Sequence, residues 1–408
     1  MPQAIVLVHA IGAELSENAS IPTLIRNNGH KVHDICFADS HKGSQRLSFN
    51  ELAGRLENSL AELENSGLDI SQSAIIGYST GAILARRWLL NRSQSGKSLP
   101  SHFISLAGPQ HGSSLAQLGN TIRSKVFPEF AADCFHERAL LEELDYASEF
   151  LWTLNEEWLK AAHNNQLATY IFSMVGDDHS DLKFQLFWQT KENGSDAATR
   201  ISSANLNYRI MSVDLGAAET TLRALELPWR TPHLVIPGVS HFGEKGILNA
   251  GNHTADTVFR NISKALSVST REDYEALASI WNQLTEDWGN AKPSHNCSTI
   301  IFNLENLAQT GHNDCLILLH DDSRNAHAIS NAIEKHQPLQ NAELKSRYSF
   351  YLNFPRFQSF PEHHISIEHK QRHELMHYEL HFEENKIPLL RANEFTYLKI
   401  RLINEESN

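Results

Sequence analysis

The sequence predicts an α/β fold in which a mostly parallel sheet, covered by helices, is followed by a mostly antiparallel β domain. Short apolar segments alternate with helical patterns over the first 270 residues, which is typical of a parallel sheet buried on both faces. After Ser269 the apolar residues fall into short strands, several of which alternate with polar residues. We therefore expect an α/β domain over 1–270, a helix and linker over 271–295, and a sandwich-like β domain over 296–408.

The first part should build its sheet from short buried strands separated by helices. Strands are predicted at Ile5–Val8, His30–Phe37, Ala74–Ile76, Phe103–Leu106, Thr169–Val175 and Leu234–Ile236, and helices at Phe49–Leu68, Gly81–Leu90 and His253–Leu266. Two stretches interrupt this order. Residues 113–165 are helical and rich in Leu, Phe and Trp, whereas residues 178–230 are polar and are expected to be irregular. Both should lie at the sheet edge where open α/β sheets bind their ligands.

The last part begins with a helix and changes to strands. A helix is predicted at Asp273–Trp288, and Gly289–His295 is the expected linker. Strands follow at Thr299–Leu304, Cys315–His320, Tyr348–Phe354, His364–Glu368, Tyr378–Phe382 and Phe395–Ile403.

The charge and composition exclude several classes of protein. With 35 Lys and Arg against 48 Asp and Glu, the net charge is −13, so nucleic acid is not an expected partner. The same charge gives no attraction to anionic membranes, so any lipid contact should be local and apolar. The four cysteines form no CxxC pair and are read as free thiols. Without a long apolar run or a signal peptide, we expect synthesis in the cytoplasm, and export without a signal peptide stays open.

Gly77-Tyr78-Ser79-Thr80-Gly81 fits the pattern G-x-S-x-G between a predicted strand and a predicted helix. A nucleophilic serine in this pattern stands on a tight, strained strand-to-helix turn, and glycines two residues to either side let the turn pack closely. The turn aims the helix N-terminus at a reacting carbonyl. Ser79 is therefore the candidate nucleophile.

An acyl-transfer site also needs backbone N–H groups that stabilise the oxyanion. One donor is expected from Thr80, which follows the nucleophile, and the second from the loop after the first strand. That strand ends in Val8-His9-Ala10-Ile11. Ile11 is the preferred donor and Ala10 the alternative.

A serine hydroxyl needs a histidine base, and the histidine needs an orienting carboxylate. Among 23 histidines, His241 follows the last predicted sheet strand and is the preferred base, with His253 and His233 as alternatives. The carboxylate should lie between nucleophile and base in the chain. Asp177 and Asp178 follow a predicted strand and Asp196 lies further along, so three candidates stay open.

Four segments of the first 270 residues resemble α/β-hydrolase lipases and phospholipases, of the PGAP-like and triacylglycerol-lipase kinds. They are Gly77–Gly81, Ser105–Ser113, Leu144–Asn155 and Ser195–Asn205. The resemblance implies an α/β-hydrolase fold with a helical lid around 113–165, and it favours Asp196 as the acid because these lipases carry Asp-Gly-x-Val there. Ala197 stands where they usually have glycine. Some bacterial members are antibacterial effectors, so this role is one that the resemblance allows.

The expected activity is hydrolysis of a carboxylic ester through a Ser-His-Asp triad, with a lipid as the preferred substrate and without a cofactor or metal. Apolar residues of the lid segment would dock acyl chains, although the same residues could equally form core. They are Leu115, Leu118, Ile122, Val126, Phe127, Phe130, Phe150, Leu151, Trp152 and Leu154. The lid and the β domain are the two candidates for peripheral membrane contact, and a protein partner stays open.

Two alternative functions compete with this hypothesis. One is a binding protein that keeps the hydrolase fold without catalysis. The other is a zinc metalloprotease, because His373-Glu374-Leu375-Met376-His377 matches H-E-x-x-H. That motif needs a helix to bring both histidines to one metal, whereas the flanking residues alternate like strands. The metal site is therefore the less favoured alternative.

Overall fold

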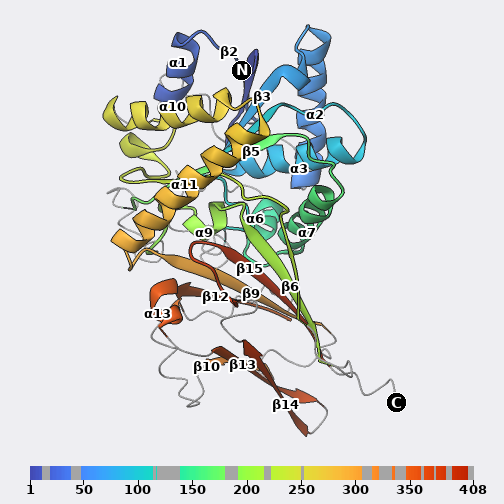
Figure 1. Cartoon of the computed structure of the whole chain (residues 1–408). Helices are drawn as coiled ribbons and strands as arrows, with labels where there is room; N and C mark the ends of the chain where they lie inside the picture. The colour runs from blue at the N-terminus through green and yellow to red at the C-terminus, as the bar shows by residue number, and fades with distance from the viewer. Residues whose placement is uncertain are drawn as a thin grey trace. The chain divides into compact units, whose positions relative to one another are not determined.

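The computed structural model describes residues 1–11, 19–37, 47–113, 116, 138–179, 192–215, 222–249, 252–305, 315–320, 333–335, 346–359, 363–371, 374–382 and 388–402. The chain forms two compact units (Figure 1). The first contains Met1–Asn207 and Leu227–Trp288, and the second contains Tyr208–Glu226 and Gly289–Asn408. Each unit is therefore built from two separate stretches of the sequence.

The first unit contains a six-stranded sheet in the order β2-β1-β3-β4-β5-β8. All neighbouring strands in it run parallel. In chain order they are β1 (Ala4–Val8), β2 (Lys31–Ile35), β3 (Ser73–Tyr78), β4 (His102–Leu106), β5 (Tyr170–Gly176) and β8 (His233–Ile236). The strands β1, β3 and β4 are buried along their whole length, as expected for a parallel sheet covered by helices on both faces. The predicted fold class of this unit is confirmed.

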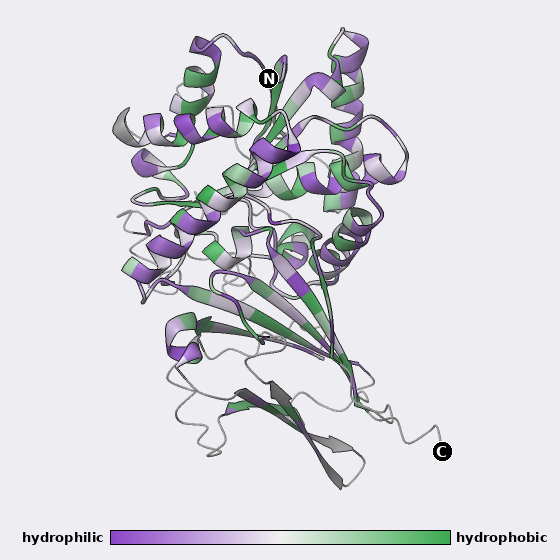
Figure 2. Ribbon diagram, in the orientation of Figure 1, coloured by the Kyte–Doolittle hydropathy of each residue, from purple (hydrophilic) through white to green (hydrophobic). Residues whose placement is uncertain are grey.

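Two groups of helices cover the sheet. On one face α1 (Ser20–Asn27), α10 (Asn252–Ser267) and α11 (Arg271–Ala291) share a buried core with β1, β3, β4 and β5. On the other, α2 (Phe49–Asn65) and α7 (Glu149–His163) pack against α3 (Thr80–Gln94). The helices α10 and α11 carry hydrophilic and hydrophobic residues on opposite sides, as expected for helices that cover a sheet (Figure 2). The helices α6 (Arg138–Leu144) and α9 (Ile201–Ala204) are short.

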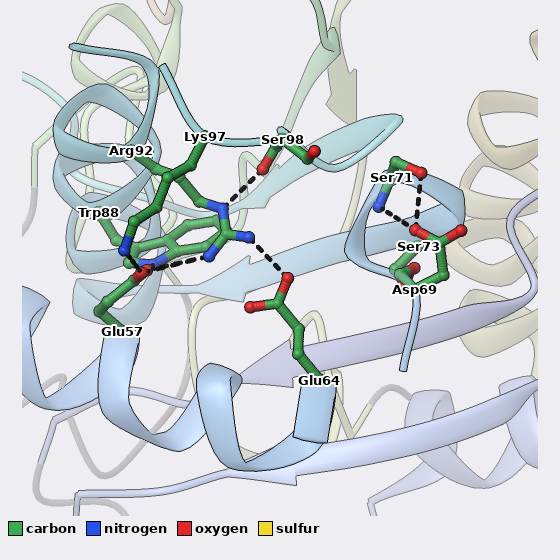
Figure 3. A network of polar contacts seen from close by, with 9 residues as sticks. All are labelled: Glu57, Glu64, Asp69, Ser71, Ser73, Trp88, Arg92, Lys97 and Ser98. Atoms are coloured by element: carbon green, nitrogen blue, oxygen red, sulfur yellow. Dashed lines mark hydrogen bonds and ion pairs between the residues drawn. The ribbon is translucent and has the colours of Figure 1, made fainter. Parts of the chain in front are cut away.

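A polar network joins α2 to α3, the helix that follows the candidate nucleophile (Figure 3). The buried guanidinium of Arg92 contacts Glu57 at 3.2 Å and Glu64 at 2.6 Å. The indole N–H of Trp88 and the ammonium of Lys97 also donate to Glu57, at 2.6 and 2.7 Å. These contacts hold the pKa of Glu57 below its usual value despite desolvation, which acts the other way. The network therefore fixes α3 by charge-assisted hydrogen bonds as well as by apolar packing.

The second unit contains two sheets. One has six strands in the order β11-β12-β9-β15-β6-β7, and the other has three strands in the order β10-β13-β14. The strands are β6 (Tyr208–Asp214), β7 (Arg223–Glu226), β9 (Cys297–Glu305), β10 (Cys315–His320), β11 (Ile333–Lys335), β12 (Arg347–Asn353), β13 (His363–Gln371), β14 (Glu374–Phe382) and β15 (Phe395–Arg401), and α13 (Phe354–Gln358) follows β12. Buried residues of both sheets share one core. The mostly antiparallel character is confirmed, although β15 runs parallel to both β9 and β6.

The expectation that residues 178–230 are irregular is wrong for three segments, the short helix α9 and the strands β6 and β7. Strands β6 and β7 lie within this stretch and form one edge of the six-stranded sheet of the second unit. Ile210, Met211 and Val213 of β6 are buried. The polar residues around β6 concealed a strand whose parallel partner, β15, lies far away in the sequence.

The H-E-x-x-H segment does not form a helix where the structure describes it. Glu374 to His377 lie on the strand β14, which pairs with β13, and His373 lies outside the described residues. Within the described ranges, no group of three or more His, Cys, Asp or Glu side chains is arranged to hold a metal ion. The helices among the described residues are too short or too polar to cross a membrane.

Candidate active site

Ser79 stands at the turn between β3 and α3. Its backbone has φ 53° and ψ −127°, a conformation that side-chain-bearing residues rarely adopt and that active sites tolerate because the surrounding structure holds it. The Ser79 N–H donates to the Leu106 carbonyl of β4 at 2.9 Å. The side chain is 8% exposed. The strain therefore presents a hydroxyl at the carboxyl edge of the sheet.

The two glycines of the motif are required by close backbone contacts. A Cβ at Gly77 would lie 2.5 Å from the Cα of Ala82. A Cβ at Gly81 would lie 2.4 Å from the carbonyl oxygens of both Val8 and His9. Any side chain at either position would therefore force the strand and the helix apart.

His241 is held from several sides. Its Nε2 lies 2.8 Å from Ser79 Oγ, and its Nδ1 lies 2.9 Å from Asp196 Oδ2. Its backbone N–H donates to the Asp196 carbonyl at 2.9 Å, and its carbonyl accepts the Tyr78 hydroxyl at 2.8 Å. The Phe242 ring lies against the imidazole, with centroids 4.3 Å apart. Two residues 162 positions apart thus share a hydrogen bond.

Asp196 lies in a tight loop and is fully buried. Its Oδ1 accepts the N–H groups of Ala198 at 3.1 Å and Thr199 at 2.7 Å, which leaves Oδ2 to the imidazole of His241. Ala197 has φ 89°, a backbone conformation that favours glycine. Ala197 therefore holds a conformation that glycine would adopt without steric cost.

The other two candidate acids point elsewhere. Asp178 forms an ion pair with Lys245 at 2.7 Å. Asp177 accepts the N–H of Gly238 at 2.7 Å and the indole N–H of Trp288 at 2.8 Å. Neither contact involves the imidazole of the preferred base.

His233, one of the two alternative bases, is not brought to the serine. His233 lies on β8, is fully buried, and its Nδ1 lies 2.6 Å from Ser173 Oγ. Burial lowers the pKa of His233 to about 3, so this imidazole stays neutral. His253 lies in the first turn of α10, and its side chain lies outside the described residues.

The two expected oxyanion donors contact each other. The Ile11 N–H donates to the side-chain hydroxyl of Thr80 at 2.8 Å. Thr80 is the first residue of α3, so helix geometry gives its own N–H no acceptor within the helix. Ala10, the alternative donor, is buried at the end of the first strand. The Ile11 amide must therefore exchange the Thr80 hydroxyl for an oxyanion if it is to act on a substrate.

The sequence did not point to two contributors to this site. Tyr78 lies inside the motif, but nothing in the sequence indicates that its hydroxyl donates a hydrogen bond to the His241 carbonyl. Glu192 and Arg200, each 3% exposed, form a bidentate ion pair at 2.8 and 2.9 Å across the base of the Asp196 loop. Opposite charges eight residues apart were the only signal for this pair, and such spacing is too common to identify one.

The described part of the lid segment is packed as core. In α7, Leu151, Trp152 and Leu154 are buried, and Phe150 stacks on Phe49 with centroids 5.0 Å apart. The helix also contacts α3 through an ion pair at 2.6 Å. The six apolar residues expected between 115 and 130 lie outside the described residues. The apolar residues of α7 therefore fit the interpretation that they form part of the core, and they do not fit a surface that binds acyl chains.

The comparisons with known proteins identify the fold. No family model and no curated protein matches the sequence. Among solved structures, the chain is similar to the phospholipase PlaB from Legionella pneumophila, with 19% identity and a TM-score of 0.82 over 98% of this chain and 94% of that one. The structure of PlaB in complex with thio-NAD gives a TM-score of 0.81 at the same identity, over 98% and 93%. The likeness extends through both units, and we conclude that the chain has an α/β-hydrolase fold with an additional, mostly antiparallel β unit.

Proposed function

We propose that the chain is a serine hydrolase that cleaves carboxylic esters, and more specifically a lipase or phospholipase. Its catalytic triad would consist of Ser79, His241 and Asp196. The observation that carries this proposal is the continuous chain of contacts from Ser79 Oγ through both nitrogens of His241 to Asp196, at 2.8 and 2.9 Å. These distances suit proton transfer. A strained serine between β3 and α3 supports the same conclusion.

The proposed reaction is acyl transfer through a covalent intermediate. His241 takes the Ser79 proton as the hydroxyl oxygen attacks the ester carbonyl, and Asp196 stabilises the imidazolium that forms. The N–H groups of Thr80 and Ile11 hold the oxyanion. The alcohol leaves with the proton from His241, and water then releases the acid and restores Ser79. No metal or organic cofactor takes part.

We further propose a lipid ester as the substrate. The likeness to a phospholipase over both units supports this class. Peripheral contact with a membrane, through the lid segment or the second unit, belongs to the same proposal. An effector role would follow only if the protein is exported and acts on the lipids of another cell.

The proposal is tested first with p-nitrophenyl esters of increasing acyl length. We expect Ser79→Ala to lower kcat on the order of 10³-fold or more, while a chelator leaves the wild type unchanged. Ser93→Ala is the matched control, because Ser93 is a buried serine near the other end of α3 whose hydroxyl donates to the Leu90 carbonyl at 2.8 Å. Activity that survives Ser79→Ala but is lost with a chelator would instead favour a metal enzyme. Absence of any hydrolysis would favour the non-catalytic binding protein.

The substrate class is tested with phospholipid vesicles and short esters in parallel. Release of fatty acid from neutral phosphatidylcholine vesicles, lost in Ser79→Ala, supports the lipid assignment. Equal rates for acetyl and long-chain esters, with no release from vesicles, would contradict it while leaving the esterase intact.

A further inference from the structure

Asp177, one of the alternative candidates for the acid, connects the loop of His241 to the end of α11. It directly follows β5 and is 3% exposed. One carboxylate oxygen accepts the Gly238 N–H at 2.7 Å, and the other accepts the indole N–H of Trp288 at 2.8 Å. A buried carboxylate is costly unless it is hydrogen-bonded. Its position between these two donors therefore calls for an explanation beyond packing.

Gly238 opens the loop that carries His241. It follows β8 and has φ 75°, a conformation that suits glycine. The next residue, Val239, is fully buried, and its carbonyl accepts the Asp178 N–H at 2.8 Å. The chain after β5 is thus bonded to the chain after β8 immediately before the histidine. The Asp177 carboxylate supplies the first contact in this series.

Trp288 also reaches the side of the site that carries the acid. Its ring, 7% exposed, packs in a small core with Val175, Ile201, Ala204 and Val235. Ile201 and Ala204 belong to α9, which begins directly after the Asp196 loop. The same side chain therefore supports β5, β8 and α9 through its ring, and the histidine loop through its N–H. Trp288 is also the last residue of the first unit, and α11 continues past it to Ala291 in the second.

We propose that Asp177 and Trp288 are positioning residues that hold His241 in line with Ser79, so that the catalytic geometry depends on the last turns of α11. The inference rests on the proposed hydrolase function for its kinetic consequence. Neither residue touches the substrate or the reacting atoms. Their effect is on the orientation of the imidazole, where small misplacements lower the rate.

The test compares two tryptophans of one helix. Trp288→Phe keeps an aromatic ring but removes the N–H that donates to Asp177. Trp281→Phe is the matched control, because Trp281 is fully buried in α11 and its indole N–H has no partner among the described residues. We expect Trp288→Phe and Asp177→Asn to lower kcat for a p-nitrophenyl ester about 10-fold to 100-fold with little change in KM. Trp281→Phe should change kcat no more than about 3-fold, even at an equal loss of Tm.

The double variant and hydrogen exchange complete the test. Because the two side chains act as one unit, Asp177→Asn with Trp288→Phe should lose no more activity than the worse single variant. The amide hydrogen of Gly238 should exchange with solvent faster in both single variants than in the wild type. In Trp281→Phe its exchange rate should be unchanged. Exchange needs no catalysis, so it decides the inference even if the wild type hydrolyses no ester and the proposed function fails. Equal kinetic losses in the two tryptophan variants, or unchanged exchange at Gly238, would overturn the inference.

Discussion

Buried histidines should make the first unit unstable in weak acid. Burial lowers the pKa of His102 to about 4 and that of His233 to about 3, and the pKa of His111 also lies well below its usual value. In the unfolded chain all three have a pKa near 6.5. Below that pH the unfolded state binds more protons than the folded state. The stability is therefore full above about pH 6.5 and is lost as the pH falls toward the folded values.

The size of the effect follows from the width of this interval. Between pH 7 and pH 5 His102 and His233 protonate only in the unfolded chain, and each removes about 2 kcal/mol from the free energy of unfolding. These two histidines together remove about 4 kcal/mol, a large part of the 5–15 kcal/mol typical of a domain, and His111 acts in the same direction. We therefore expect the free energy of unfolding of this unit to be markedly smaller at pH 5 than at pH 7.

His102→Gln isolates one of these contributions. The His102 Nε2–H donates to the Val268 carbonyl at 2.9 Å, and a glutamine amide can keep that bond without titrating. Denaturant unfolding gives the free energy of unfolding at pH 7 and at pH 5. The loss of this free energy between pH 7 and pH 5 should be about 2 kcal/mol smaller in His102→Gln than in the wild type. All seven tryptophans precede residue 289, so their fluorescence follows this unit. His163→Gln, at the exposed end of α7, is the control. An equal loss of unfolding free energy between pH 7 and pH 5 in His102→Gln and in the wild type would refute the reasoning.

Three further predictions concern the geometry around the nucleophile. Thr80→Val removes the hydroxyl that the Ile11 N–H must release before it can bind an oxyanion, and it should raise kcat about 3-fold, with Thr80→Ser close to wild type. A Thr80→Val enzyme slower by about 10-fold would mean that the hydroxyl positions the Ile11 amide instead. Glu192→Gln leaves a buried arginine without its charge partner and should cost about 3–5 kcal/mol of stability in denaturant unfolding, so an unchanged midpoint would contradict the role given to the pair. The added methyl group of Gly81→Ala would clash with two carbonyl oxygens, so this variant should abolish ester hydrolysis. A Cβ at Gly54 in α2 meets nothing within 4 Å, so Gly54→Ala should raise the free energy of unfolding by about 1 kcal/mol. Hydrolysis retained in Gly81→Ala would contradict the packing argument.

The features that could be predicted from the sequence are those with a local cause. Most strands of the first unit are short, largely apolar runs, and glycines flank Ser79 because no side chain fits at Gly77 or Gly81. The position of His241 followed from its place after the last strand of the sheet. The catalytic roles of these residues stay predictions until the variants are measured.

What the sequence could not reveal depends on contacts between distant segments. The strand β6 pairs with β15, and no local pattern records such a partner. Apolar residues at helical spacing in α7 fitted a cap and a core equally, because periodicity identifies a face but not what covers it. The bond between Ile11 and the Thr80 side chain likewise needed coordinates.

The division of the second unit has a consequence for how the protein is made. Tyr208 of β6 pairs with Phe395 of β15, 187 residues later, so a ribosome needs roughly 10–40 s between the two strands. During that time one edge of β6 has no partner strand, and its backbone N–H and C=O groups can pair with other nascent chains. The chain leaves and re-enters the first unit at neighbouring points, since Asn207 bonds to the Thr231 carbonyl at 2.8 Å. A soluble fragment of the first unit therefore calls for excision of 208–226, because simple truncation after α11 would leave that edge permanently open.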